Sequence, residues 1–219
     1  MNRRGLILSV AALGAAAFGG ATWFVNRPAP ASETETIAPE RAEALIRPYS
    51  PILGPEDAPV TIVEFFDPAC EACRAFHPIV KDIMAEHGDA VRVVIRYTPF
   101  HGEGSEVAIR VLEAARMQGV FEPVLEAVLR DQPQWASHGS MRPELLIGIA
   151  ASAGLDPEAA QAQFLAPQTT GVLNQDRADV ETVGVRQTPT FFVNGMPLDP
   201  FGEAELRRLV ATEVAAVQS

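Results

Sequence analysis

The chain has 219 residues, of which 47% are hydrophobic, which is enough for a packed core and excludes an intrinsically disordered chain. Its 28 acidic and 17 basic residues give a formal net charge of −11, which argues against a nucleic-acid partner, because binding a phosphate backbone needs a basic face. Two cysteines are too few for a disulfide-dense scaffold or a four-thiolate zinc site.

The N-terminus has the pattern of an export signal. Residues 5–25 carry no charged side chain and follow Arg3 and Arg4, which is the order of a basic and then an apolar segment. Residues 29–31, Ala-Pro-Ala, fit a cleavage site, but the apolar run is also long enough to span a bilayer. We therefore expect residues 1–31 to be a signal peptide or a membrane anchor, and the rest to lie in a bacterial periplasm.

The next segment, residues 32–52, is rich in Pro, Glu and Ser and is predicted to be a linker or a stalk. It contains one short helical candidate at Pro39–Arg47. This helix could instead pack on the domain or support self-association.

The first folded part of the chain has the pattern of a βαβ unit. Residues 60–66 are almost wholly apolar and β-branched or aromatic, as in a strand that is covered on both faces. A helix is expected from about Cys70 to His87, with Gly88 as its end, and a second strand over 91–97. This order predicts a parallel pair of strands.

Amphipathic helices are predicted for the middle of the chain. Apolar residues recur with helical spacing over 108–115, 121–129 and 146–153, and packing in the core explains them. The remaining elements are expected to be a helix over 169–183, a strand over 190–193, a hairpin turn at Asn194-Gly195, a return strand over 196–198 and a helix over 202–214.

The clearest chemical motif is Cys70-Glu71-Ala72-Cys73. It follows a buried strand and opens a helix, whose N-terminal N–H groups stabilise a thiolate and lower its pKa. Cys70 is therefore the predicted nucleophile, and Cys73, a turn further in, is the predicted resolving thiol. Such a pair exchanges disulfides through a mixed disulfide and needs no bound cofactor, because the disulfide itself carries two electrons.

Other interpretations of the cysteine pair stay open. A Cys/Cys/His set with His77 could hold a metal, although a structural zinc site needs about four ligands. A structural disulfide closing so short a loop would stabilise little. The two thiolates could also bind a soft ion such as Cu(I), or be incidental in an interaction module.

Two segments together resemble a known family. Residues 65–73, Phe-Phe-Asp-Pro-Ala-Cys-Glu-Ala-Cys, and residues 188–195, Thr-Pro-Thr-Phe-Phe-Val-Asn-Gly, are similar to the DsbA-like family of thioredoxin-fold thiol–disulfide oxidoreductases. The resemblance implies an α/β thioredoxin-like domain over residues 53–219 with an inserted all-helical subdomain at about 104–167. It also implies that the Thr188–Pro189 bond is cis and that both residues line the substrate site.

The resemblance gives expected roles to two charged residues inside apolar strands. Glu64 matches a buried acid beneath the active site, which would act on the thiol pKa values and could relay a proton. Arg96 matches a cationic residue that can pair with this acid and tune it. The alternative is that each side chain points to solvent at the end of its strand.

The dipeptide between the cysteines departs from the strongest oxidases of the family, which resemble Cys-Pro-His-Cys. Glu71 places a negative charge near Cys70, which should raise the pKa of Cys70 and make the protein a weaker oxidant. Thr188 before the proline also occurs in isomerase-like and reductase-like relatives, so the direction of electron flow stays open.

These patterns predict an exported thiol–disulfide oxidoreductase that acts on cysteine-containing client proteins, with dithiol oxidation as the expected direction. A periplasmic isomerase or reductase is the alternative. A membrane redox partner that regenerates the protein is implied by the resemblance, and residues 5–25 could anchor the chain. No role is assigned to three isolated histidines and one tryptophan in a polar segment: His87, His101, His138 and Trp135.

Overall fold

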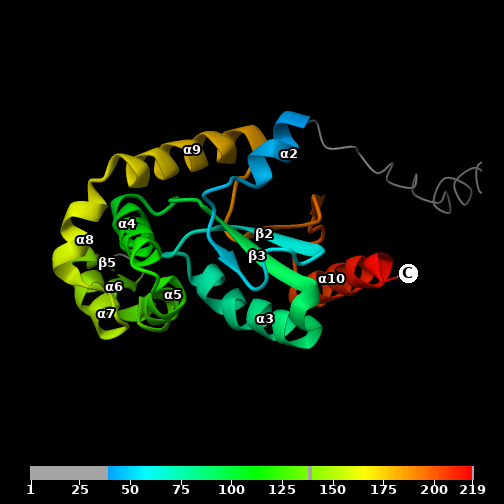
Figure 1. Ribbon diagram of the computed structural model, residues 1–219, viewed down its shortest axis with the longest axis horizontal. Coiled ribbons are helices and arrows are strands. Elements are labelled where there is room, and N and C mark those ends of the chain that lie inside the picture. Colours follow the sequence, from blue (N-terminus) through cyan, green and yellow to red (C-terminus); the bar gives the residue numbers. More distant parts are fainter. Residues whose placement is uncertain (1–38, 138–139, 219) are drawn as a thin grey trace, which may run out of the picture. The chain divides into compact units, whose positions relative to one another are not determined.

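A five-stranded mixed sheet forms the centre of the computed structural model, which describes residues 39–137 and 140–218 (Figure 1). The strands, in sheet order, are β1 (Ile52–Leu53), β3 (Val91–Tyr97), β2 (Val60–Phe66), β6 (Thr190–Val193) and β7 (Met196–Pro197). β2 runs parallel to β3 and antiparallel to β6. The predictions for residues 1–31 and His138 fall outside the described residues.

Helices cover both faces of this sheet. On one face lie α3 (Glu71–His87) and α10 (Glu203–Val217), and on the other lie α2 (Pro39–Leu45) and α9 (Pro167–Val183) (Figure 1). Successive side chains of a strand point to opposite faces, so β2 contributes Ile62 and Phe66 to one hydrophobic core and Val63 and Phe65 to the other. This explains why all seven residues of β2 are buried and mostly apolar.

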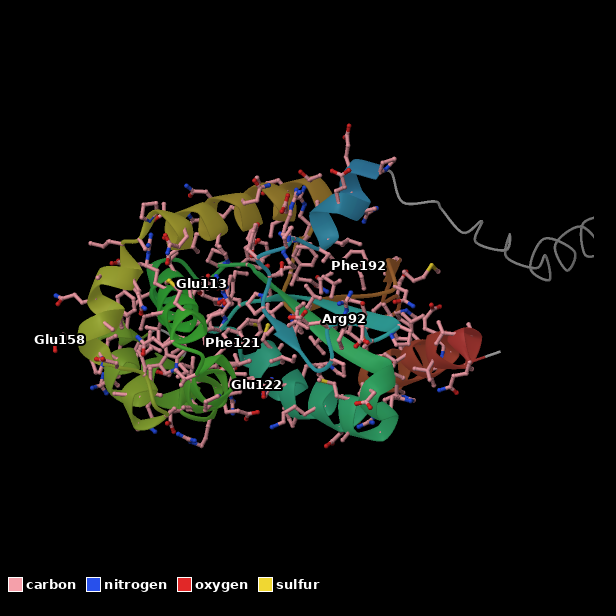
Figure 2. All side chains as sticks on the ribbon, in the orientation of Figure 1. Arg92, Glu113, Phe121, Glu122, Glu158 and Phe192 are labelled. Carbon is pink, nitrogen blue, oxygen red and sulfur yellow. The ribbon has the colours of Figure 1, made fainter. Side chains whose placement is uncertain are left out.

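A mainly helical part lies between β3 and α9. Its helices are α4 (Glu103–Met117), α5 (Phe121–Arg130), α6 (Gln132–Trp135), α7 (Leu146–Ser152) and α8 (Pro157–Phe164). In Figure 2, Glu113 marks α4, Phe121 and Glu122 mark the start of α5, and Glu158 marks α8, whereas Arg92 and Phe192 lie on the sheet.

The prediction that this part is all-helical is wrong in one place. A two-stranded sheet joins β4 (Ala136–Ser137) to β5 (Ser140–Met141), and strands of two residues are too short to leave a periodic pattern. The polar segment around Trp135 also contains a buried element that its composition does not indicate. Trp135 ends α6, is fully buried, and donates from Nε1 to the carbonyl oxygen of Val128 at 2.9 Å.

Residues 39–52 are not a linker in the structure. Ala44 and Leu45 of α2 are buried in the core against α9, and β1 pairs with β3. Arg47 forms two hydrogen bonds with Asp179 of α9, at 2.8 and 2.7 Å. Of the alternatives for the short helix, packing on the domain is therefore the correct one. The segment is too short, and too rich in Pro and Glu, to show this from its pattern.

The order β2-α3-β3 and then β6-β7-α10 around one sheet is that of a thioredoxin-like fold, so the predicted fold class is confirmed. The β6–β7 hairpin turns at Asn194 and Gly195, whose φ angles of 46° and 84° lie in the left-handed region that this turn needs. Across the part of the chain that the structure describes, no helix is both long and apolar enough to cross a membrane.

Candidate active site

The two cysteines lie where β2 ends and α3 begins. Cys70 is the N-cap residue of α3, with its φ and ψ at −79° and 122°, and Cys73 lies in the first turn. Both are free thiols, so the structure shows the reduced form. Cys70 is 7% exposed and Cys73 is fully buried, which leaves only Cys70 accessible to another molecule.

The two thiols differ strongly in acidity. A hydrogen bond from the Cys73 thiol lowers the pKa of Cys70 to about 5; burial opposes this shift, and hydrogen bonds from the Thr188 side chain and the Cys73 and Ala72 backbone support it. Burial raises the pKa of Cys73 far above its usual range, and the hydrogen bond to Cys70 and the charge of Glu64 add to this. At neutral pH Cys70 is therefore a thiolate, and Cys73 keeps its proton.

Glu64 lies beneath the pair, at the middle of β2. It stands opposite Ile95 of β3 and Phe191 of β6, it is 4% exposed, and its Oε1 has no hydrogen-bond partner. Burial and, to a smaller extent, the charge of Cys70 together raise its pKa to about 8. The alternative that Glu64 points to solvent is wrong, and its carboxyl group is protonated at neutral pH.

Arg96 does not pair with Glu64, and this prediction is wrong. In the register of the two strands Arg96 stands opposite Phe65, one residue further on than Glu64 and therefore on the other face of the sheet. There it is fully buried, and its Nη2 lies 2.7 Å from Asp176 Oδ1 and 2.6 Å from Asp179 Oδ2. The spacing of the two aspartates on α9, three residues apart, is a signal that the sequence carries for this pairing.

Glu71 is exposed at the start of α3. Its charge does not dominate the acidity of Cys70, whose pKa is lowered overall. The reason is that the hydrogen-bond donors around Cys70 are close and partly shielded from water, whereas the Glu71 side chain is solvated.

Thr188 and Pro189 face the redox pair from the start of β6. Their peptide bond is cis, as is that of Asp199–Pro200. The Cys70 thiol lies 3.2 Å from the carbonyl oxygen of Thr188, across 118 positions of the sequence, and Pro189 is buried. The structure thus brings together four of the predicted site residues: Cys70, Cys73, Thr188 and Pro189.

Two further residues of this site were not found from the sequence. Asp67 is fully buried, and its carboxylate accepts hydrogen bonds from the backbone N–H groups of Ala69, Phe100 and His101, at 2.9, 2.8 and 3.1 Å. It also lies 2.7 Å from Nδ1 of His101. The loops after β2 and β3 are thereby tied together. Both loops follow the carboxyl ends of parallel strands, where binding sites of α/β proteins are usually found. The positions of Asp67 and His101 after the two predicted strands could therefore have identified them as site residues.

His101 shares a groove with Cys70. The groove has a volume of about 440 Å³ and lies between the start of α3 and the β4–β5 hairpin; it is lined by Ala69, Cys70, Glu71, Ala72, His101, Ala136, Ser137, Ser140 and Met141. The groove provides space directly beside the nucleophile. His101 is therefore not the isolated histidine that its place in the sequence suggested.

The Cys/Cys/His metal set considered from the sequence is not assembled. Nε2 of His77 lies 3.0 Å from Glu126 Oε1 on α5, away from the thiols. Within residues 39–137 and 140–218, no group of three or more His, Cys, Asp or Glu side chains is arranged to hold a metal ion.

Comparisons with known proteins agree with this geometry. A family model described as thioredoxin matches residues 47–212. A thioredoxin-like oxidoreductase from Silicibacter pomeroyi DSS-3 has a solved structure that is 31% identical, covers 80% of this chain and 96% of its own, and gives a TM-score of 0.68. Disulfide bond formation protein D of Bacillus subtilis is 27% identical over 75% of this chain and 77% of its own length.

A different kind of protein also contains a related segment. The Na(+)/H(+) antiporter NhaA of Herminiimonas arsenicoxydans is 40% identical over 67% of this chain, but the match spans only 22% of the antiporter's length. The family match, by contrast, extends over most of the chain and includes both cysteines and the Thr188–Pro189 segment. The chain therefore belongs to the thioredoxin family, among its DsbA-like thiol–disulfide oxidoreductases.

Proposed function

We propose that this protein is a thiol–disulfide oxidoreductase that forms disulfides in cysteine-containing proteins outside the cytoplasm. The observation that carries the proposal is the unequal pair: a Cys70 pKa of about 5 beside a Cys73 thiol that keeps its proton. A thiolate stabilised in this way favours the reduced form of the protein, and a protein with a stable reduced form is a strong oxidant. This supports oxidation over the isomerase or reductase alternative.

The reaction begins from the oxidised protein, in which Cys70 and Cys73 form a disulfide. A client thiolate attacks the sulfur of Cys70, the bond between the two cysteines breaks, and Cys73 leaves as a thiolate and takes up a proton. A second client thiolate then attacks the client sulfur of the mixed disulfide, and Cys70 leaves as a thiolate. The client loses two electrons, which remain in the reduced pair.

Glu64 is the proposed source of the proton for Cys73. Its pKa of about 8 keeps it protonated at neutral pH, and its charge acts directly on the acidity of Cys73. A proton donated to the leaving Cys73 thiolate removes a buried charge, and the carboxylate recovers its proton from the client thiols through solvent. Thr188 and Pro189 are proposed to present their backbone to the client chain beside Cys70.

The reduced pair must then be reoxidised, and we propose a membrane redox partner for this step. The name of the Bacillus subtilis relative, disulfide bond formation protein D, supports the assigned direction. The apolar segment 5–25 supports placement outside the cytoplasm, as an exported or anchored protein.

The reduction potential of the Cys70–Cys73 couple tests the proposal. Equilibration with glutathione buffers should give a value near about −120 mV, as for a strong oxidase, whereas a value near about −230 mV or lower would make the protein a reductase or an isomerase. Cys70→Ser should abolish oxidation of a reduced dithiol peptide. If the variant and the wild type oxidise the peptide equally fast, the cysteines are incidental and the proposal fails.

A further inference from the structure

Gln132 links the helical part of the chain to the redox pair. It is the first residue of α6 and is fully buried. Its Nε2 donates to the carbonyl oxygens of Pro68 at 2.8 Å and Cys70 at 3.0 Å, and its Oε1 accepts from Nε of Arg74 at 3.0 Å. Both polar atoms of this amide are thus bonded to the segment that carries the two cysteines.

These bonds act on the turn that fixes the start of α3. The carbonyl oxygen of Cys70 also accepts from the N–H of Arg74 at 3.1 Å, which is the first hydrogen bond of the helix. Gln132 therefore adds a second donor to the N-cap carbonyl and holds the carbonyl two residues before it. The N–H groups of Ala72 and Cys73 stabilise the Cys70 thiolate, so the position of this helix start decides how well they reach the sulfur.

The same turn is held differently on its N–H side. Asp67 accepts from the N–H of Ala69 through its side chain, and from the N–H of Cys70 through its carbonyl oxygen at 3.0 Å. Asp67 directly follows β2, at the edge of the sheet, whereas Gln132 lies 62 positions beyond Cys70 in the helical part. The N–H groups of the turn are thus fixed from the sheet, and its carbonyl groups from the helical part.

We propose that Gln132 is a positioning residue through which the helical part, residues 103–164, sets the stability of the Cys70 thiolate and with it the oxidising strength of the pair. This inference rests on the proposed function, since it assumes that the pair is redox-active. It gives the helices of this part a role in the chemistry, in addition to the role of the β4–β5 hairpin in lining the groove beside Cys70.

Two variants test the inference. Gln132→Met keeps the length of the side chain but removes both donors and the acceptor. Gln132→Glu keeps an acceptor for Arg74 but can no longer donate to the two carbonyl groups. In both, the pKa of Cys70, followed by the ultraviolet absorbance of its thiolate, should rise by about one unit. The equilibrium constant for oxidising glutathione should fall about tenfold, which corresponds to a potential lower by about 30 mV.

Gln118→Met is the matched control. Gln118 is also a tether inside the helical part: its Nε2 donates to the carbonyl oxygen of Asp156 at 3.1 Å, and its Oε1 accepts from the N–H of the same residue at 2.7 Å. Its replacement should lower the thermal stability and leave both the pKa of Cys70 and the potential unchanged. Equal shifts in the Gln118 and Gln132 variants would show a general effect of stability and overturn the inference.

A measurement on the wild type covers the case in which the Gln132 variants do not fold. The side-chain amide protons of Gln132 should exchange slowly with solvent in the full chain, and their resonances should shift as Cys70 titrates. Fast exchange of these amide protons, or resonances that do not shift as Cys70 titrates, would overturn the inference. If the wild type instead shows no low-pKa thiol and forms no Cys70–Cys73 disulfide, the proposed function itself fails.

Discussion

The two faces of the central sheet bury charged groups in opposite ways. On the face covered by α2 and α9, Arg96 is fully buried and bonded to Asp176, Asp179 and the carbonyl oxygen of Ala44. On the face covered by α3 and α10, Glu64 is buried with one carboxyl oxygen that lacks a hydrogen-bond partner. Arg96 is bonded to two carboxylates and a carbonyl oxygen. Within the part of the chain that the structure describes, no cation forms an ion pair with Glu64, whose charge is coupled to the two thiols instead.

This difference separates a structural charge from a functional one. A buried ion pair holds its charges in one state, because removing either partner is costly. A buried acid without a cation lies near neutrality and changes its protonation when a neighbouring charge appears or disappears. Glu64 responds in this way to Cys70 and Cys73, and Arg96 has no such neighbour.

Removing the buried ion pairs of Arg96 should have the largest effect on stability. Arg96→Met leaves Asp176 and Asp179 without the buried cation between them, and we expect the free energy of unfolding to fall by about 3–5 kcal/mol. Urea denaturation measures this loss. The pKa of Cys70 should not change, because the substitution lies on the other face of the sheet.

An exposed ion pair between the last turn of α9 and the segment after it is the control for Arg96. Arg186 lies 3.4 Å from Glu181, with both side chains more than 70% exposed. Arg186→Met should change the free energy of unfolding by no more than about 0.5 kcal/mol. A loss below about 1 kcal/mol for Arg96→Met would mean that the buried network contributes no more than a surface pair.

Replacing the buried acid Glu64 should alter the pH dependence of stability. The pKa of Glu64 is raised in the folded protein to about 8, so its folded form holds a proton that the unfolded chain releases near pH 4.5. Stability is therefore lost as the pH rises from about 5 to 8. We expect the reduced wild type to lose about 3–4 kcal/mol over this range relative to Glu64→Gln, measured by urea denaturation at each pH.

The difference in unfolding free energy between the wild type and Glu64→Gln reports on Glu64 alone. The pKa of Cys70 is lowered on folding, so Cys70 adds stability as the pH rises, but it does so in both proteins and largely cancels. If the plots of unfolding free energy against pH for the wild type and Glu64→Gln stay parallel between pH 5 and 8, Glu64 is ionised in the folded state at neutral pH. A buried proton source for Cys73 would then be excluded.

The smallest effect is expected at the rim of the redox site. Glu71→Gln removes an exposed charge, which should lower the pKa of Cys70 by about 0.3 unit, since water screens the interaction. The thiolate absorbance reports the change, and Glu122→Gln, at an exposed acid on α5, should leave it unaltered. A decrease of more than one unit would mean that Glu71, and not the surrounding donors, controls the thiol.

The sequence predicted the features that depend on local pattern. The strand before Cys70, the helix after it and the Asn194-Gly195 turn are encoded by short stretches of residues, and the structure has them where they were expected. The predicted Arg96–Glu64 pair failed because it depended on which face of a strand each residue occupies. Asp67, His101 and Gln132 escaped notice because their contacts with the redox segment depend on how the loops and helices meet in the folded chain.

The contact between Cys70 and Thr188 spans 118 positions, and that with Gln132 spans 62. A chain that is synthesised from its N-terminus exposes Cys70 and its neighbouring helix turn first, and the distant groups only later. Only the stabilisation from Ala72 and Cys73 is available to the emerging segment. The pKa of Cys70 therefore reaches its low value only after the last third of the polypeptide has been made. Cys70 is less reactive in the nascent chain than in the finished protein.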